Sequence, residues 1–475
     1  MEHPVIIQGG MGIGISDWRL ARAVARKGQM GVVSGTALDS VLARRLQMGD
    51  PGGHMRRGLA HFPAPQIARR VQEKYYIPGG KAPDRAFAPV PVFSAAPPVG
   101  LVELTLAANF VEVFLAKEGH DGPVGINLME KIQLPNLISL YGAMLAGVDY
   151  VLMGAGIPRE IPGVLDALGE HAATWLKLHV EEAESGDDFR LHFDPKNIIP
   201  DALPPLKRPY FLPIISSVTL ALSLAKKANG RVDGFIVEGP IAGGHNAPPR
   251  GALRTTVAGE PIYGPKDAVD IGRLRRLGLP FWQAGGYAHP DKVRQARDGG
   301  AAGVQVGTAF MLCRESGLDA QVKERLIGQL QRGEIRIFTD PSASPTGFPF
   351  KVVQMEDSLA VDAVYQERPR RCDLGYLQVP YKKADGSLGR RCPSEPERAF
   401  SHKGGAEGAV EGRKCLCNAL LANIGLPQVR RGDYVEPTLV TAGEDLTAVK
   451  HFLAAGNNSY GAAEVVDYLL SETRC

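Results

Sequence analysis

The stretch GFIVEGPIAGGH, Gly234–His245, decides the fold, because an apolar run ends in a glycine turn that presents one histidine. Two later stretches repeat the arrangement: PFWQAGG at Pro280–Gly286 and GVQVGT at Gly303–Thr308. Each apolar run predicts a buried strand, and a helical pattern follows each turn. Strand, glycine turn and helix in series are typical of the rim of a β/α barrel, where such proteins carry their chemistry.

Short apolar runs elsewhere complete a set of eight strands. Most lack polar alternation, as expected of strands that are covered on both faces. Helical patterns over 17–27, 218–228 and 290–298 follow three of them. The sequence therefore predicts an α/β fold, a (β/α)8 TIM barrel. Its expected strands are 5–8, 31–34, 124–128, 149–153, 211–215, 234–237, 280–284 and 303–306.

Two insertions and a tail add to the barrel, which we expect to span residues 1–335. Residues 36–122 are rich in Pro, Gly and Arg, and we interpret them as lid helices. Within the insertion 157–210, two alternating stretches predict a β-hairpin outside the barrel. Residues 336–475 change character and predict a small cysteine-containing C-terminal subdomain, with helical patterns at 446–454 and 462–470.

The composition predicts a globular cytoplasmic protein. Of 475 residues, 44% are hydrophobic and 22% are charged, and 54 basic against 51 acidic residues give a net charge of +3. That balance argues against a nucleic-acid partner, which needs a dense basic face. No apolar run predicts a membrane span or a signal peptide. Barrels of this size often associate, so a homo-oligomer stays open.

Two glycine turns on consecutive strands predict a phosphate site. Gly285-Gly286 and Gly307-Thr308 let backbone N–H groups converge without obstruction by a Cβ, and a helix N-terminus adds a favourable dipole. A single pair of glycines would only indicate a tight turn. Two such turns at this end of a barrel favour phosphate binding.

His245 is the candidate catalytic residue. An imidazole at the rim can move protons near neutral pH. The alternative is a structural histidine that bonds a nearby carbonyl. Its place on the face that carries chemistry in such barrels favours the catalytic role.

The turn Gln8-Gly9-Gly10-Met11 follows the first strand, and its spacing does not fit the dinucleotide fingerprint. It allows the backbone to approach a flat ring closely. Asn127, at the end of the third strand, can donate its amide to the same ring, although capping of its own loop explains it almost equally well.

Taken together, these motifs resemble the nitronate monooxygenase (2-nitropropane dioxygenase) family of FMN-dependent barrels, which includes flavin-dependent enoyl reductases. The resemblance covers roughly residues 4–315 and implies FMN at the carboxyl ends of the strands. It implies that His245 stands near the reactive flavin nitrogen. The implied cofactor-binding residues are Gln8, Gly9, Gly10, Met11, Asn127, Ser217, Glu238, Gly243, Gly244, Ala284, Gly285, Gly286, Gln305, Gly307 and Thr308.

The resemblance implies an oxidoreductase that oxidises a nitronate or similar small anion with oxygen. Where short members of the family have a Thr-Gly-Arg-Pro-Ala-Arg-like stretch, this chain has Ser344–Lys351, which marks a long-form branch. The alternative within the family is an enoyl reductase that uses NAD(P)H and acts on an acyl thioester. Two other classes stay open: a non-flavin barrel that binds a phosphorylated metabolite, and a flavin-binding interaction partner.

Four of the six cysteines fall between residues 372 and 417, with the spacing C-x19-C-x22-C-x-C. In a reducing compartment such clustering favours a metal site over disulfides. Four thiolates can bind Zn or hold an iron–sulfur cluster, and nothing in the spacing decides between them. Free thiols are the alternative. The candidate ligands are Cys372, Cys392, Cys415 and Cys417.

Overall fold

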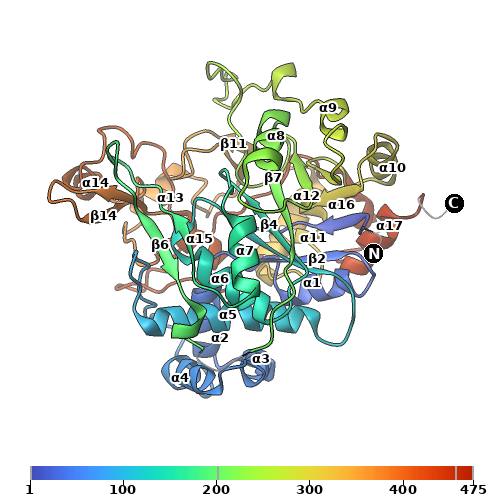
Figure 1. The fold of residues 1–475 in the computed structure, drawn as a ribbon. Coiled ribbons are helices and arrows are strands. Elements are labelled where there is room, and N and C mark those ends of the chain that lie inside the picture. Colours follow the sequence, from blue (N-terminus) through green and yellow to red (C-terminus); the bar gives the residue numbers. More distant parts are fainter. Residues whose placement is uncertain (1–2, 200–202, 455–456, 473–475) are drawn as a thin grey trace.

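The computed structural model describes residues 3–199, 203–454 and 457–472 (Figure 1). Its centre is a closed barrel of eight parallel strands in the order β1-β10-β9-β8-β7-β4-β3-β2. All eight strands lie where the apolar runs predicted them, so the predicted barrel is confirmed. The strands are β1 (Ile6–Gln8), β2 (Met30–Ser34), β3 (Val124–Met129), β4 (Tyr150–Gly154), β7 (Tyr210–Ile215), β8 (Phe235–Glu238), β9 (Phe281–Ala284) and β10 (Gly303–Val306).

The strands carry apolar residues on both faces because each face packs against protein. Alternate residues such as Ile7, Ile236 and Trp282 fill the barrel interior. The residues between them, such as Phe235 and Phe281, face the surrounding helices. This double burial explains why the strands read as unbroken apolar runs in the sequence.

The helices around the barrel begin at recognisable caps. Asp17 caps α1 (Trp18–Ala25) by accepting from the backbone N–H groups of Arg19 and Leu20. Two more helices lie where they were expected, α8 (Val218–Lys227) and α10 (Pro290–Asp298). The other helices of the barrel are α6 (Gln133–Leu145), α7 (Ile161–Gly169), α9 (Ile271–Arg275) and α11 (Thr308–Met311).

The insertion 36–122 is helical but covers the side of the barrel. Its longest helix, α5, is apolar on all faces and mostly buried, so it needs protein around it. Of the described helices, α5 alone is long and apolar enough to cross a membrane. The shorter helices cover α5, and Figure 1 shows α3 and α4 at the edge of the molecule. The helices are α2 (Leu38–Gln47), α3 (His54–Ala60), α4 (Pro65–Tyr75) and α5 (Val99–Lys117).

The insertion 157–210 contains the predicted hairpin. Strands β5 (Thr174–Lys177) and β6 (Arg190–Phe193) pair antiparallel, with Leu176 opposite Leu191. They form a separate two-stranded sheet outside the barrel, as the alternating pattern predicted.

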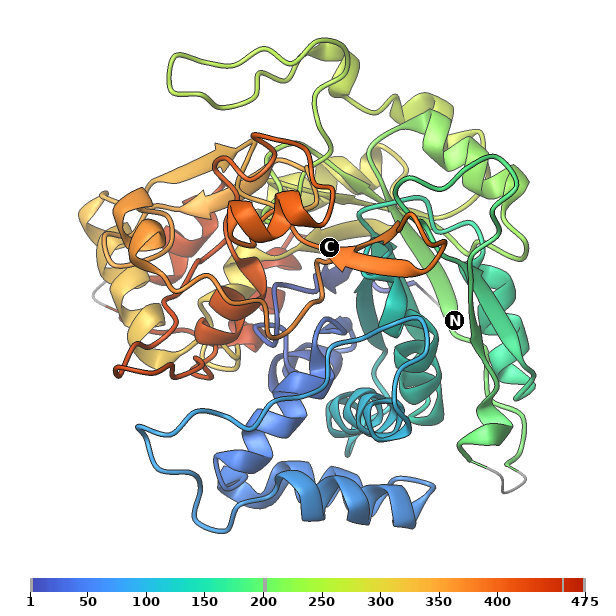
Figure 2. The same ribbon diagram turned by 90° about the vertical axis from the view of Figure 1, so that its left-hand side faces the viewer.

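The C-terminal segment lies along one side of the barrel in Figure 2. Leu421, Val440 and Val465 belong to the same hydrophobic cluster as the barrel helices. Helices occur near both predicted positions at the end of the chain, while a domain boundary at residue 335 stays a prediction. The elements are α12 (Ala320–Arg332), β11 (Ile337–Asp340), β12 (Phe350–Val353), α13 (Asp362–Glu367), β13 (Val379–Lys382), β14 (Leu388–Arg391), α14 (Glu397–His402), α15 (Leu416–Ala422), α16 (Thr447–Phe452) and α17 (Ala462–Leu469).

Candidate active site

A cavity of about 240 Å³ opens at the carboxyl ends of the barrel strands. Glycine turns after β1, β8, β9 and β10 form much of its wall. Fourteen of the sixteen candidate catalytic and cofactor residues line it. They are Gly9, Gly10, Met11, Asn127, Glu238, Gly243, Gly244, His245, Ala284, Gly285, Gly286, Gln305, Gly307 and Thr308.

Gln8 lies behind this wall and supports it. Its side chain is fully buried; Nε2 donates to Ser16 Oγ at 2.9 Å, and Oε1 accepts from the Val32 N–H at 3.0 Å. Ser16 Oγ in turn donates to the Gly9 carbonyl and accepts from the Met11 N–H, both at 3.0 Å. Gln8 and Ser16 therefore fix the turn after β1, while direct contact of Gln8 with a cofactor stays a prediction.

Ser217 does not take part, contrary to the prediction. It is absent from the described residues that line the cavity, and its Oγ accepts from the Leu220 N–H at 3.1 Å. Because β7 ends at Ile215 and α8 starts at Val218, Ser217 falls at the N-cap of the helix.

The turn after β1 approaches its neighbour too closely for a side chain. A Cβ at Gly10 would lie 2.5 Å from the Cβ of Asn127. The side chain of Gln305 approaches Gly9 similarly, and its Oε1 is buried without a hydrogen-bond partner in the described structure. A buried acceptor of this kind is costly unless a ligand donates to it.

The predicted phosphate end has the expected backbone. Gly285 and Gly286 adopt φ of 92° and 78°, in the left-handed region that favours glycine. Thr308 Oγ1 accepts from the Gly443 N–H at 2.8 Å. Since a hydroxyl also has a hydrogen to donate, Thr308 can still donate to a phosphate.

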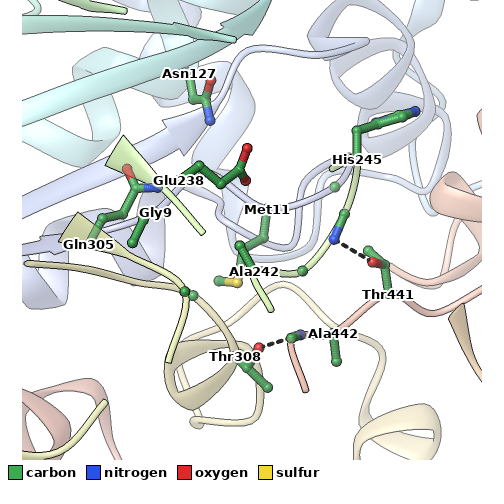
Figure 3. Close-up of a pocket in the computed structure, with 18 of the residues that line it drawn as sticks. Gly9, Met11, Asn127, Glu238, Ala242, His245, Gln305, Thr308, Thr441 and Ala442 are labelled. Carbon is green, nitrogen blue, oxygen red and sulfur yellow. Dashed lines mark hydrogen bonds between the residues drawn. The ribbon is translucent and has the colours of Figure 1, made fainter. Parts of the chain in front are cut away.

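The C-terminal segment also lines the cavity, a role that the sequence did not predict. Thr441 Oγ1 accepts from the Gly244 N–H at 2.9 Å, so this segment fixes the turn that carries His245 (Figure 3). The sequence signal for this role is the apolar pair Leu439-Val440 followed by Gly443, which resembles the strand-and-glycine pattern of the barrel rim. Other lining residues that the sequence did not predict include Ser34, Thr36, Tyr287, Leu420, Ala442 and Asp445.

The insertion 36–122 contributes little to this cavity. Within the described chain, Thr36 is its one lining residue. The shorter helices α2, α3 and α4 pack on α5, and α5 packs on the barrel wall. These helices therefore do not form the lid that was expected.

His245 stands across the cavity from Glu238, Asn127 and Gln305 (Figure 3). Its Nε2 lies 2.7 Å from Ser344 Oγ, and its ring packs on Phe350 with centroids 4.8 Å apart. Burial, and then repulsion by Lys131, lower the pKa of His245 to about 4. The imidazole is therefore neutral at neutral pH, able to accept a proton and not a standing cation.

Glu238 ends β8 and faces the same cavity. Burial raises the pKa of its carboxyl to about 8, and Lys351 offsets part of that rise. Lys351 is itself fully buried and pairs with Glu444. At neutral pH Glu238 is mostly protonated and can donate a hydrogen bond.

We expect Glu238→Gln to flatten the dependence of stability on pH. The pKa of this carboxyl is about 8 in the folded protein and 4.5 when the group is unperturbed. The folded state thus binds more protons between these values, and the free energy of unfolding falls as pH rises through them. Thermal unfolding midpoints of both proteins at several pH values test this. A parallel fall in the variant would contradict the assignment.

The four clustered cysteines converge on a second, small cavity. Cys372, Cys392, Cys415 and Cys417 all line it, and all four are free thiols. Burial raises the pKa of the Cys417 thiol, and the other three cysteines raise it further. Within the described residues, no three His, Cys, Asp or Glu side chains are close enough to hold a metal ion.

Comparisons with known proteins agree with the motifs. Residues 208–341 match the family model described as nitronate monooxygenase. A nitronate monooxygenase of Pseudomonas aeruginosa PAO1 is 33% identical over 121 residues, which is 25% of this chain and 32% of that protein. The resemblance predicted from the glycine turns is confirmed in this segment.

A second curated relative is (3aS,4S,5R,7aS)-5-hydroxy-7a-methyl-1-oxo-octahydro-1H-indene-4-carboxyl-CoA dehydrogenase of Rhodococcus jostii RHA1. It is 33% identical over 116 residues, which is 24% of this chain and 29% of that protein. The chain thus spans about a third of the length of the curated relatives it matches.

Solved structures similar to the chain include FabK of Thermotoga maritima, with a TM-score of 0.47 and 16% identity, covering 99% of this chain and 93% of that one. Nitroalkane oxidase of Streptomyces ansochromogenes has a TM-score of 0.45 and 14% identity, covering 99% and 95%.

Proposed function

We propose that this chain, whose residues 208–341 match the nitronate monooxygenase family model, is an FMN-dependent oxidoreductase acting on a small-molecule substrate. The glycine-lined cavity at the carboxyl ends of the barrel strands is its active site. The preferred substrate is a nitronate or similar small anion, with oxygen as the electron acceptor. The confirmed barrel and the family match support this proposal.

The observation that carries the proposal is the fit of the cavity to FMN. Gly285 and Gly286 adopt the left-handed backbone of an anion-binding turn, and Thr308 has a hydroxyl hydrogen to donate. At the other side, the unpaired Gln305 Oε1 offers an acceptor to a ring N–H. Gly10 lets the turn after β1 lie against Asn127, where any Cβ would clash. These residues would hold the phosphate and the ring respectively.

Bound FMN supplies the electron transfer from substrate to oxygen, and the protein supplies position and protons. His245, neutral and held by Ser344, accepts a proton from substrate or donates a hydrogen bond to it. A histidinium that balances a nitronate charge is disfavoured by its low pKa. Lys131 lowers the pKa of His245, and its Nζ lies 4.1 Å from the centroid of the Phe348 ring.

A second candidate is oxidoreduction of an acyl thioester with NAD(P)H, as an enoyl reductase. The observation in its favour is the name of the Rhodococcus relative, a dehydrogenase of a carboxyl-CoA compound. The apolar part of the cavity wall, which includes Ile214, Ile241 and Leu420, suits an acyl chain.

The test begins with the flavin content of the purified protein. We expect heat to release FMN, and alkyl nitronates to drive oxygen uptake with release of nitrite. Oxidation of NAD(P)H that depends on an enoyl thioester, without nitronate turnover, would favour the reductase instead. Failure to take up added FMN would overturn both and leave a phosphate-binding barrel of another chemistry. Bound FMN without turnover of either substrate class would contradict the enzymatic proposal and favour a flavin-binding interaction partner.

A further inference from the structure

We propose that Cys372, Cys392, Cys415 and Cys417 hold an iron–sulfur cluster. The four thiols, called here the cysteine group, come from separate parts of the C-terminal segment. Cys372 lies beyond α13, Cys392 directly follows β14, and Cys415 and Cys417 stand at the start of α15. Convergence of all four on one cavity is what four-thiolate cluster ligation requires. The proposal does not depend on the flavin.

The spacing of the thiols favours a cluster over a single metal ion. A zinc ion holds four sulfurs at about 2.3 Å, which brings the sulfurs together in a tight tetrahedron. Among the described residues, no three such side chains are arranged to hold a single metal ion. A cluster places several iron and sulfide atoms between its ligands, so its thiolates stand farther apart.

The surroundings suit an anionic cluster. Arg371 lines the same cavity, and the carboxylate of Glu395, which also lines it, pairs with Lys403. Asn418 Nδ2 donates to Cys415 Sγ at 3.9 Å, the kind of hydrogen bond to sulfur that tunes such clusters. Leu374 and Leu377 add apolar lining that limits access of water.

A bound cluster would also stabilise this part of the chain. Between residues 372 and 422 its regular elements are two strands of four residues and two helices of six and seven residues. Short elements of this kind bury little apolar area, and bound metal commonly supplies the missing stability. A cluster would join the loop at Cys372, the end of β14 and the start of α15.

The cysteine group also lies next to the flavin cavity. Cys417 lines the small cavity and Leu420 lines the large one, and both belong to α15. Three residues of helix advance by about 4.5 Å along its axis. One short helix thus forms part of the wall of both cavities.

The experiment is measurement of iron and acid-labile sulfide in the full chain, purified without oxygen. Protein that lacks iron is treated with ferrous iron, sulfide and a thiol reductant before the assay. We expect stoichiometric iron and sulfide, a broad visible absorbance that remains after FMN is released, and an electron paramagnetic resonance signal after reduction. Absence of iron after this treatment, or zinc in its place, would overturn the proposal.

Two cysteine variants distinguish loss of a cluster ligand from loss of folding. Cys372→Ser changes the most exposed thiol of the group, and we expect at least a severalfold loss of iron and sulfide together with a changed resonance signal. Cys313→Ala removes a buried thiol outside the group and should retain both. Flavin content and the circular dichroism spectrum report folding of each variant. A folded Cys372→Ser protein with full iron and an unchanged signal would contradict the assignment of that ligand.

Discussion

Replacement of His245 by alanine is expected to lower kcat/KM by about 10²–10⁴-fold, the usual contribution of a positioned acid or base. The side chain lines the flavin cavity and Ser344 holds its Nε2. Its removal leaves the glycine turns at the phosphate end unchanged, so FMN content should stay near that of the parent. Steady-state kinetics with the best substrate, together with flavin absorbance, measure both quantities.

The matched control is His192→Ala, which removes an exposed histidine of the hairpin strand β6. This variant should keep full activity. In the parent, kcat/KM should fall as pH drops through about 4, where His245 gains a proton and can no longer accept one. Full activity of the His245→Ala protein would end the catalytic assignment and leave His245 a structural residue.

The second large effect is expected from Gly286→Val, which should weaken FMN binding by at least about tenfold, equal to roughly 1.4 kcal/mol. The backbone of Gly286 is left-handed, with φ of 78°, and a Cβ would lie 2.4 Å from Cδ1 of Ile241. Either the Ile241 side chain or the turn would have to move, and movement of the turn would take its N–H groups off a phosphate. Fluorescence titration of flavin-free protein with FMN measures the affinity.

Gly278→Val provides the control for backbone strain. Gly278 has a similar φ of 70°, lies in an exposed turn, and has no heavy atom within 4 Å of the position a Cβ would take. Both variants carry the left-handed penalty of about 1–2 kcal/mol, yet only Gly286→Val should lose FMN. Equal loss of FMN in the two variants would show that strain, and not the site, controls binding.

The barrel was predictable because its determinants are local. Each strand is a short apolar run, and a glycine turn or helix start follows most of them within a few residues. The residues of the flavin cavity follow from the same logic, since parallel strands bring their carboxyl ends to one edge. The density of cysteines between 372 and 417 likewise pointed to the group that the fold assembles.

Ser217 was expected to contact the cofactor, but β7 ends at Ile215 and Ser217 is the N-cap of α8. The other errors arose where contacts distant in sequence decide the structure. The insertion 36–122 was expected to be a lid, but burial of the mostly apolar α5 controls its position. The segment around Thr441 contributes to the cavity from almost 200 residues away in sequence, a pairing with His245's turn that no local pattern encodes.

Helix α15 forms part of both cavities, so any movement of this helix on binding would link their occupancies thermodynamically. If a group bound by the cysteines changes the position of Leu420, it changes the affinity of the larger cavity for its ligand. Linkage is reciprocal: the factor by which one occupant alters binding of the other is the same in both directions. Bound flavin would then change the affinity of the cysteines for their group by a certain factor. The group bound by the cysteines would change the affinity for flavin by the same factor.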